Sequence, residues 1–266
     1  MKPPATLRIQ SSEIHPCFPL TMNHPASFVR SAGLALALAA AALHAERPSP
    51  AASADPATYL KDLGVLLRAQ WPKNRAVTIV CHGHSVPAGY YKTPVVDTFN
   101  AYPHLFHVGL KERFPYAVVN VIVTAIGGED SEAGAKRFEK DVLSLHPDLV
   151  AIDYALNDRR IGLPRAKTAW VSMIELAKKQ GVPVILLTPT GDLSAKLDDP
   201  ADPLNQHAGQ IRKLAAEHHV GLVDSLAAFK EHIRKGGKLD DLMAQVNHPN
   251  RAGHDLVVKE ILKWIP

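Results

Sequence analysis

The stretch AVTIVCHGHSVPAG, residues 76–89, decides how this chain is expected to fold. Its first part (76–81) is continuously apolar and rich in Val and Ile, which is typical of a strand that is covered on both faces of a sheet. The apolar run ends in a polar segment punctuated by Gly83 and Gly89. This pattern predicts a buried strand that turns sharply into the next element, with Ser85 placed directly after the strand.

The same alternation of apolar runs and helical patterns continues along the rest of the chain. Four further apolar runs are 117–123, 148–154, 183–188 and 220–224. Amphipathic patterns predict helices over about 102–114, 131–145, 164–180, 204–218 and 255–264. Strands that alternate with helices favour the α/β class, here a five-stranded parallel sheet with helices on both faces. In such a fold ligands bind at the carboxyl ends of the strands, so a site is expected in the segments that follow them.

Length and composition are those of a folded globular domain. The 266 residues are 46% hydrophobic and 21% charged, which is close to the average for soluble domains. We find no internal repeat and no second linker, so a single domain is expected. The formal charge is +4, but the chain has no basic run of the kind that follows a phosphate backbone. Nucleic acid is therefore not expected as a partner.

The first 45 residues have the pattern of a secretory signal peptide. The segment SAGLALALAAAAL (31–43) is a short apolar run that follows Arg30 and precedes a small-residue cleavage pattern ending at Ala45. A start at Met22 gives this signal peptide an ordinary length. The run is shorter than the roughly 20 residues that span a bilayer. We therefore expect a secreted or periplasmic protein with no stable membrane insertion after the signal peptide 1–45 is removed.

A flexible tether rich in Pro, Ala and Ser is expected at 46–58, followed by the folded domain at 59–266. Cys17 lies in the segment that is removed, which leaves Cys81 as the one cysteine of the mature chain. No internal disulfide is then possible. We expect Cys81, at the end of an apolar strand, to act as a small buried hydrophobic residue.

Polar segments follow three of the predicted strands, two of them with glycine, and a further polar segment precedes the last helix. A serine hydroxyl becomes a good nucleophile when a neighbouring histidine takes its proton, and Ser85 and His248 are residues of these types in the first and last segments. The oxyanion that forms needs preorganised donors. The N–H groups of Ser85 and Gly128 and the side-chain amide of Asn157 are candidates for this role. In chain order the segments are 81–89, 125–131, 155–158 and 247–254.

The order of these segments resembles that of the SGNH/GDSL hydrolase superfamily, over about 77–258. The resemblance implies a three-layer α/β/α sandwich with flavodoxin-like winding, and the hydrolysis of acyl esters without a metal or an organic cofactor. It implies that Ser85 is the nucleophile and His248 the base. It also implies that Gly128 and Asn157 line the oxyanion hole together with the N–H of the serine.

Two positions depart from the family pattern. His84 stands where the family usually has Asp directly before the serine, and Gln245 stands where it usually has Asp three residues before the histidine. An aspartate at the second position would orient the imidazole and stabilise its charged form, whereas an amide oxygen accepts the imidazole N–H without a charge. We expect a Ser–His dyad with His248 oriented by Gln245 or by a backbone carbonyl. The alternative is a loop that returns Asp240 or Asp241 to the histidine.

A metal site is the competing interpretation of the other histidines. His82 and His84 alternate as neighbours on a strand do, and His104 or His107 would complete a set of ligands. No cysteine or carboxylate cluster accompanies them, so we expect no metal. His254, near the start of the last predicted helix, is interpreted as a brace for the catalytic loop.

The expected substrate is a small-molecule or carbohydrate ester. The polar loop 188–209 is expected to overhang the site, and Tyr90, Tyr91 and Tyr102 follow the nucleophile and offer rings for a sugar face. Together with export, these features favour removal of acetyl groups from carbohydrate. The alternatives are a lysophospholipase or thioesterase, and a non-catalytic carbohydrate-binding protein of the same fold.

Overall fold

The structure, a computed structural model, describes residues 52–266. The predicted signal peptide (1–45) and the start of the predicted tether lie outside the described residues. The end of the tether contacts the folded part of the chain, because the N–H of Ala54 donates to the carbonyl of Val220 at 3.2 Å. Within the described part, no helix is long and apolar enough to cross a membrane. The boundaries of the signal peptide and tether stay predictions.

Five strands form one parallel sheet in the order β2-β1-β3-β4-β5. This is the flavodoxin-like order, and it confirms the expected fold class. The central strands β1 and β3 are buried on both faces, which is why their sequences are continuously apolar. The strands are β1 (Ala76–Gly83), β2 (Val118–Val123), β3 (Leu149–Asp153), β4 (Val184–Leu187) and β5 (Gly221–Val223).

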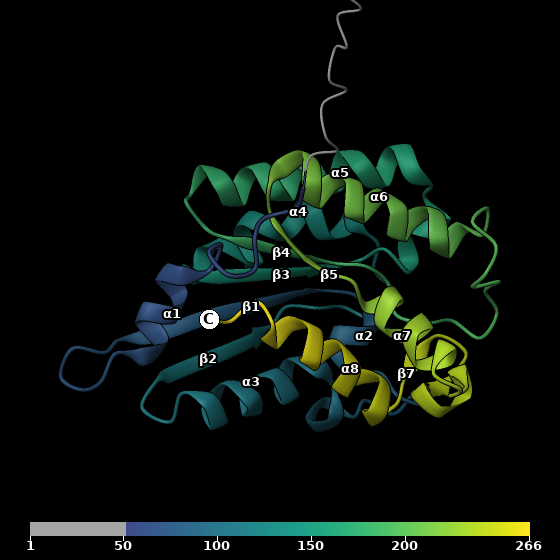
Figure 1. The fold of residues 1–266 in the computed structure, drawn as a ribbon. Helices are drawn as coiled ribbons and strands as arrows, with labels where there is room; N and C mark the ends of the chain where they lie inside the picture. Colours follow the sequence, from purple (N-terminus) through teal and green to yellow (C-terminus); the bar gives the residue numbers. More distant parts are fainter. Residues whose placement is uncertain (1–51) are drawn as a thin grey trace, which may run out of the picture. The chain divides into compact units, whose positions relative to one another are not determined.

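Helices cover both faces of the sheet and make the three layers (Figure 1). On one face α4, α5 and α6 bury residues such as Phe138, Trp170 and Ile211. On the other face α1, α3, α7 and α8 contribute to a second apolar core that contains Phe106 and Phe229. The α-helices are α1 (Lys61–Arg68), α2 (Ser85–Ala88), α3 (Tyr102–Arg113), α4 (Ser131–Asp141), α5 (Leu163–Lys179), α6 (Pro203–His218), α7 (Ser225–Arg234) and α8 (Arg251–Leu262).

Short elements surround the carboxyl ends of the strands. The 3₁₀ turns are η1 (Thr98–Asn100), η2 (Leu143–Leu145), η3 (Asn157–Arg160) and η4 (Leu239–Leu242). A small antiparallel ladder joins β6 (Met243–Gln245) to β7 (His248–Pro249). This ladder precedes α8 and was not expected from the sequence, because neither of its strands is long enough to show a periodic pattern.

Several helix boundaries differ from the expected ones. The helix expected at 131–145 ends at Asp141, and its last residues form the separate turn η2. The last helix begins at Arg251 rather than at Asp255, because the side chain of Asn250 accepts the N–H of Gly253 and caps the helix there. The helices α1, α2 and α7 were not expected.

Candidate active site

Ser85 follows the end of β1 and is the first residue of α2. The preceding Gly83 is required there, because a Cβ atom would come within 2.4 Å of the carbonyl oxygen of Asp153 on the neighbouring strand. His84 caps α2, and its Nδ1 accepts the N–H of Val86 at 3.2 Å. The serine is therefore not needed as the helix cap, and its hydroxyl is left for other contacts.

The structure brings Ser85 and His248 together from positions 163 residues apart. The Nε2 atom of His248 lies 2.9 Å from the hydroxyl oxygen of Ser85, which is hydrogen-bond distance. Each of the two residues is only 6% exposed. His248 comes from β7, where it pairs with Gln245 on β6. This geometry permits the transfer of a proton from the serine to the imidazole.

The other ring nitrogen of His248 has two polar neighbours. Its Nδ1 lies 3.2 Å from the carbonyl oxygen of Tyr91 and 2.8 Å from Nε2 of Gln245. The amide oxygen of Gln245 is used elsewhere, because it accepts the N–H of Thr93 at 2.9 Å. Gln245 therefore lies beside Nδ1 as expected, but with its amide nitrogen rather than its oxygen facing the ring. The acceptor beside Nδ1 is the backbone carbonyl of Tyr91, which is the alternative that the sequence left open.

Among residues 52–266, no carboxylate takes the place of the missing aspartate beside His248. Asp240 and Asp241 are both exposed, and the carboxylate of Asp241 accepts the N–H of Lys238 instead. Burial lowers the pKa of His248 below its usual value, an effect that the Tyr91 carbonyl opposes. The imidazole is therefore neutral at neutral pH, which is the form that accepts a proton.

Unused hydrogen-bond donors lie on the segments that follow β1, β2 and β3. Among residues 52–266, the N–H groups of Ser85 and Gly128 donate to no other protein group. Gly128 has a φ of +79°, which favours glycine, and the space beside its Cα is open. The amide of Asn157 donates one hydrogen to the carbonyl of Glu129 at 2.8 Å. Its second hydrogen remains free for an oxyanion.

Tyr90 lies between the base and the glycine loop. Its ring packs so closely on Gly127 that a Cβ atom there would be 2.7 Å from it. The centres of the Tyr90 and His248 rings are 5.8 Å apart. Tyr90 and Tyr91 are both half-buried, so part of each side chain remains accessible beside the histidine.

Tyr102 does not offer a ring to a substrate, in contrast to the sequence-based expectation. It is fully buried, because the start of α3 packs into the apolar core. Its N–H donates to Nδ1 of His254 at 3.2 Å. His254 is buried on α8 and joins that helix to α3, and its role as a brace for the catalytic loop stays a prediction.

A buried polar network lies below the glycine loop, and sequence reasoning missed it. The hydroxyl of Tyr154 donates to Glu129 at 2.9 Å and lies 3.1 Å from Nε2 of His82. Arg137 forms an ion pair with the same Glu129 carboxylate. Burial lowers the pKa of His82 to about 4, so its ring is neutral. Glu129 directly follows Gly128, so the network fixes the loop that carries the glycine.

The described residues do not form the competing metal site, and Cys81 is buried as expected. Within 52–266, no group of three or more His, Cys, Asp or Glu side chains is arranged to hold a metal ion. His104 on α3 makes an edge-to-face contact with Phe99, with ring centres 5.0 Å apart. Cys81 is buried and free, and burial raises the pKa of its thiol to about 12. It therefore behaves as a structural residue.

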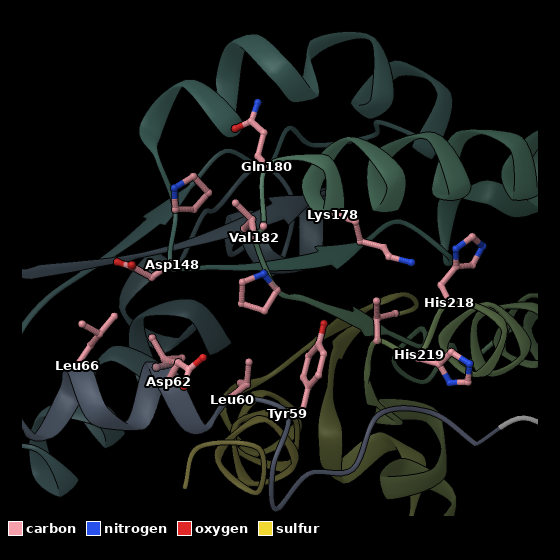
Figure 2. A pocket seen from close by; sticks show the side chains of 15 residues that line it. Tyr59, Leu60, Asp62, Leu66, Asp148, Lys178, Gln180, Val182, His218 and His219 are labelled. Atoms are coloured by element: carbon pink, nitrogen blue, oxygen red, sulfur yellow. The ribbon is translucent and has the colours of Figure 1, made fainter.

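Hollows occur at both edges of the sheet. One of about 530 Å³ lies at the amino edge, where Figure 2 shows Tyr59, Lys178, His218 and His219 around it. Another of about 430 Å³ borders the loop that contacts His248. Most of the residues that line it are of polar or charged type; they are Tyr91, Asp97, Asn100, Asn250, Arg251, Ala252 and Asp255.

Comparison with known proteins identifies several relatives. The GDSL-like lipase/acylhydrolase family matches residues 81–256. An acetylxylan esterase from Geobacillus stearothermophilus is 27% identical over 171 residues, which cover 59% of this chain and 78% of that protein. The segments that the sequence singled out all lie within the family match.

Solved structures share the fold. Axe2, an acetylxylan esterase from Geobacillus stearothermophilus, has a TM-score of 0.62 at 22% identity, with 71% of this chain and 94% of that chain covered. A two-domain esterase active on acetylated mannans has a TM-score of 0.63 at 23% identity, with 78% of this chain and 52% of that chain covered. Catalytic mutants of Axe2 carry alanine in place of a serine, an aspartate or a histidine.

Proposed function

The chain belongs to the GDSL-like lipase/acylhydrolase family and is a carboxylic ester hydrolase, and on that basis we propose that it removes acetyl groups from carbohydrate with Ser85 as nucleophile and His248 as base. The observation that carries the proposal is the distance of 2.9 Å between the serine hydroxyl and Nε2 of the histidine. A neutral imidazole at this distance takes the hydroxyl proton as the serine attacks the ester carbonyl.

The intermediate is stabilised by donors that the protein does not use elsewhere. As the ester carbonyl becomes tetrahedral, its oxygen gains a negative charge and accepts hydrogen bonds from the N–H groups of Ser85 and Gly128 and from the amide of Asn157. The protonated His248 then gives its proton to the sugar oxygen as the bond between this oxygen and the carbonyl carbon breaks, which releases the sugar hydroxyl and leaves acetyl-serine. Water hydrolyses the acetyl-serine by the same steps, with the histidine again acting as base.

The tautomer of His248 decides whether it acts as a base. Nε2 must be without hydrogen to accept the serine proton, so Nδ1 must carry the hydrogen and donate it to the Tyr91 carbonyl. The amide of Gln245 points its own N–H at the same Nδ1, which suits the opposite tautomer. We infer that the carbonyl orients the active tautomer and that Gln245 opposes it.

A polar acetylated glycan is the substrate class that the surroundings favour. The similar proteins from Geobacillus stearothermophilus are acetylxylan esterases, and a structural neighbour acts on acetylated mannans. The 430 Å³ hollow beside the His248 loop has several polar and charged side chains in its lining, among them Asp97, Asn100 and Arg251. These groups suit the hydroxyls of a sugar better than they suit a long acyl chain.

Export is part of the proposal, because polymeric glycans are met outside the cytoplasm. The signal-peptide pattern that ends at Ala45 supports it. Sequencing the N-terminus of the protein from culture medium or periplasm checks it. We expect Glu46 as the first residue, and an intact segment 22–45 in the recovered protein would contradict the proposal.

Activity on acetylated xylooligosaccharides and on nitrophenyl esters of increasing chain length tests the function. We expect a preference for acetyl over esters of eight or more carbons, and the reverse preference would favour a lysophospholipase or thioesterase. The Ser85→Ala variant is expected to lose at least about 10³-fold in kcat with its fold unchanged. Unaltered turnover in a folded Ser85→Ala protein would refute the assignment of the nucleophile.

A further inference from the structure

The loop between β4 and α6 (188–202) contains a buried carboxylate that the proposed chemistry does not use. Asp192 is only 2% exposed. Its Oδ2 accepts a hydrogen bond from Nη2 of Arg159 at 2.6 Å. Charge-assisted bonds of this kind are short and strong, so the loop is held firmly at this point.

Arg159 connects Asp192 to the turn that holds Asn157, one of the predicted oxyanion-hole residues. It belongs to η3, the turn that begins at Asn157. While its Nη2 binds Asp192, its Nε donates to the carbonyl of Leu156 at 2.8 Å. The planar guanidinium therefore joins the buried carboxylate to the residue directly before Asn157.

Leu193, the next residue of the loop, contacts the segment that holds His248, the proposed base. The N–H of Leu193 donates to the carbonyl of Val246 at 2.8 Å. Val246 lies in the connection between β6 and β7, between Gln245 and His248. The loop therefore contacts the segment that holds the catalytic histidine as well as the turn that holds the asparagine.

Asp192 also fixes the conformation of the loop next to these two contacts. Its Oδ1 accepts the N–H of Ser194 at 2.8 Å and the hydroxyl of the same serine at 2.5 Å. Burial alone would raise its pKa, but the bonds from Ser194 and Arg159 lower the pKa below the usual value. The carboxylate of Asp192 is therefore ionised at every pH at which His248 is neutral and can act as a base.

We propose that Asp192 is a positioning residue that holds the Asn157 turn and the His248 segment at a fixed separation. The inference rests on the proposed function, because the separation matters only if both residues act on one ester. The carboxylate touches neither the substrate nor the reacting atoms. It acts through Arg159 on one side and through the adjoining Leu193 N–H on the other, and misplacement of about 1 Å between catalytic groups is costly in rate.

A double-mutant cycle between Asp192→Asn and Asn157→Ala tests the proposal on acetylated xylooligosaccharide and nitrophenyl acetate. We expect Asp192→Asn to lower kcat about 10-fold with KM within about 2-fold, since only the geometry of the transition state changes. Asn157→Ala alone is expected to lower kcat about 10²-fold to 10³-fold. In the Asp192→Asn background its cost is expected to be at least about 3-fold smaller, because the amide is already out of position.

The matched control is Asp148→Asn. Asp148 also pairs with an arginine, Arg75, but at the opposite edge of the sheet, so this variant is expected to leave kcat unchanged. If Asp192→Asn unfolds the protein, Arg159→Gln breaks the same contact from its more accessible side and enters the same cycle. Effects of Asp192→Asn and Asn157→Ala on kcat that simply multiply would overturn the proposal.

Failure of the inference is distinguishable from failure of the proposed function. If Ser85→Ala abolishes turnover but Asp192→Asn leaves kcat unchanged, only the positioning role of Asp192 is wrong. If Ser85→Ala leaves turnover unchanged, the proposed mechanism itself is wrong.

Discussion

The two edges of the same sheet carry similar polar groups. They differ in whether these groups are already hydrogen-bonded to other groups of the protein. At the amino edge, the carboxylate of Asp148 accepts bonds from Arg75 and from the N–H of Thr78. His218 there pairs with Glu175 at 2.8 Å. At the carboxyl edge, a serine hydroxyl and a histidine nitrogen lie 2.9 Å apart, beside N–H groups that have no acceptor in the part of the protein that the structure describes.

Free N–H donors distinguish the carboxyl edge from the amino edge, whereas the volumes of the two hollows do not indicate the candidate site. The amino edge has the larger of the two hollows, about 530 Å³ against about 430 Å³. In a parallel α/β sheet, helices begin near the carboxyl edge and end near the amino edge, so unpaired N–H groups collect at the carboxyl edge. An oxyanion needs N–H groups, which the amino edge does not offer in this way.

The largest expected difference between the edges is in the two histidines. His248→Ala is expected to lower kcat for nitrophenyl acetate by about 10³-fold or more, because the serine loses its base. His218→Ala removes a histidine of the amino edge and is expected to leave kcat within about 2-fold. Steady-state kinetics on both folded variants checks this. Equal losses of kcat in the two variants would show that the carboxyl edge is not the catalytic one.

An intermediate effect is expected from Gln245→Glu, which keeps the shape of the side chain. One glutamate oxygen replaces the amide oxygen that accepts the N–H of Thr93, and the other accepts the Nδ1 hydrogen of His248. The active tautomer then gains an acceptor and the imidazolium gains a charged partner, so we expect kcat/KM to rise by about 10-fold.

The pH dependence provides a second readout of the same change. Burial lowers the pKa of His248, and the base works only when neutral, so activity of the natural chain is expected to fall on the acid side with a midpoint below 6.5. In Gln245→Glu the new carboxylate favours the protonated form, so this midpoint is expected to move to higher pH. An unchanged midpoint together with unchanged kcat/KM would show that position 245 does not act on the histidine.

The smallest effect on turnover is expected from Asp148→Asn. The carboxylate of Asp148 accepts bonds from Arg75 and Thr78, and its loss is expected to lower the free energy of unfolding by about 1–2 kcal/mol. Turnover is expected to stay within about 2-fold, because the amino edge takes no part in the chemistry. Denaturant unfolding and steady-state kinetics measure the two quantities, and a large loss of kcat in folded protein would contradict the separation of the edges.

The sequence determined the arrangement of strands and the order of the polar segments. Continuous Val and Ile runs such as 76–81 are a local property, and they correctly predicted the strands of a parallel sheet. The turns after β1, β2 and β3 were also predicted in place, because polar residues, with glycine after β1 and β2, follow the apolar runs. Ser85, Gly128, Asn157 and His248 were singled out by the chemistry of their side chains and backbone and by the resemblance to the SGNH/GDSL superfamily.

Only the tertiary structure decided which groups surround these residues. The acceptor for His248 is the carbonyl of Tyr91, 157 positions away, and no side-chain type announces the direction of a carbonyl. Tyr102 belongs to the core although its sequence neighbours suggested an accessible ring. The contact between Asp192 and Arg159 joins two loops, so neither residue predicts it alone. The physical reason is that strands and turns follow from neighbouring residues, whereas burial and hydrogen-bond partners depend on how distant segments pack.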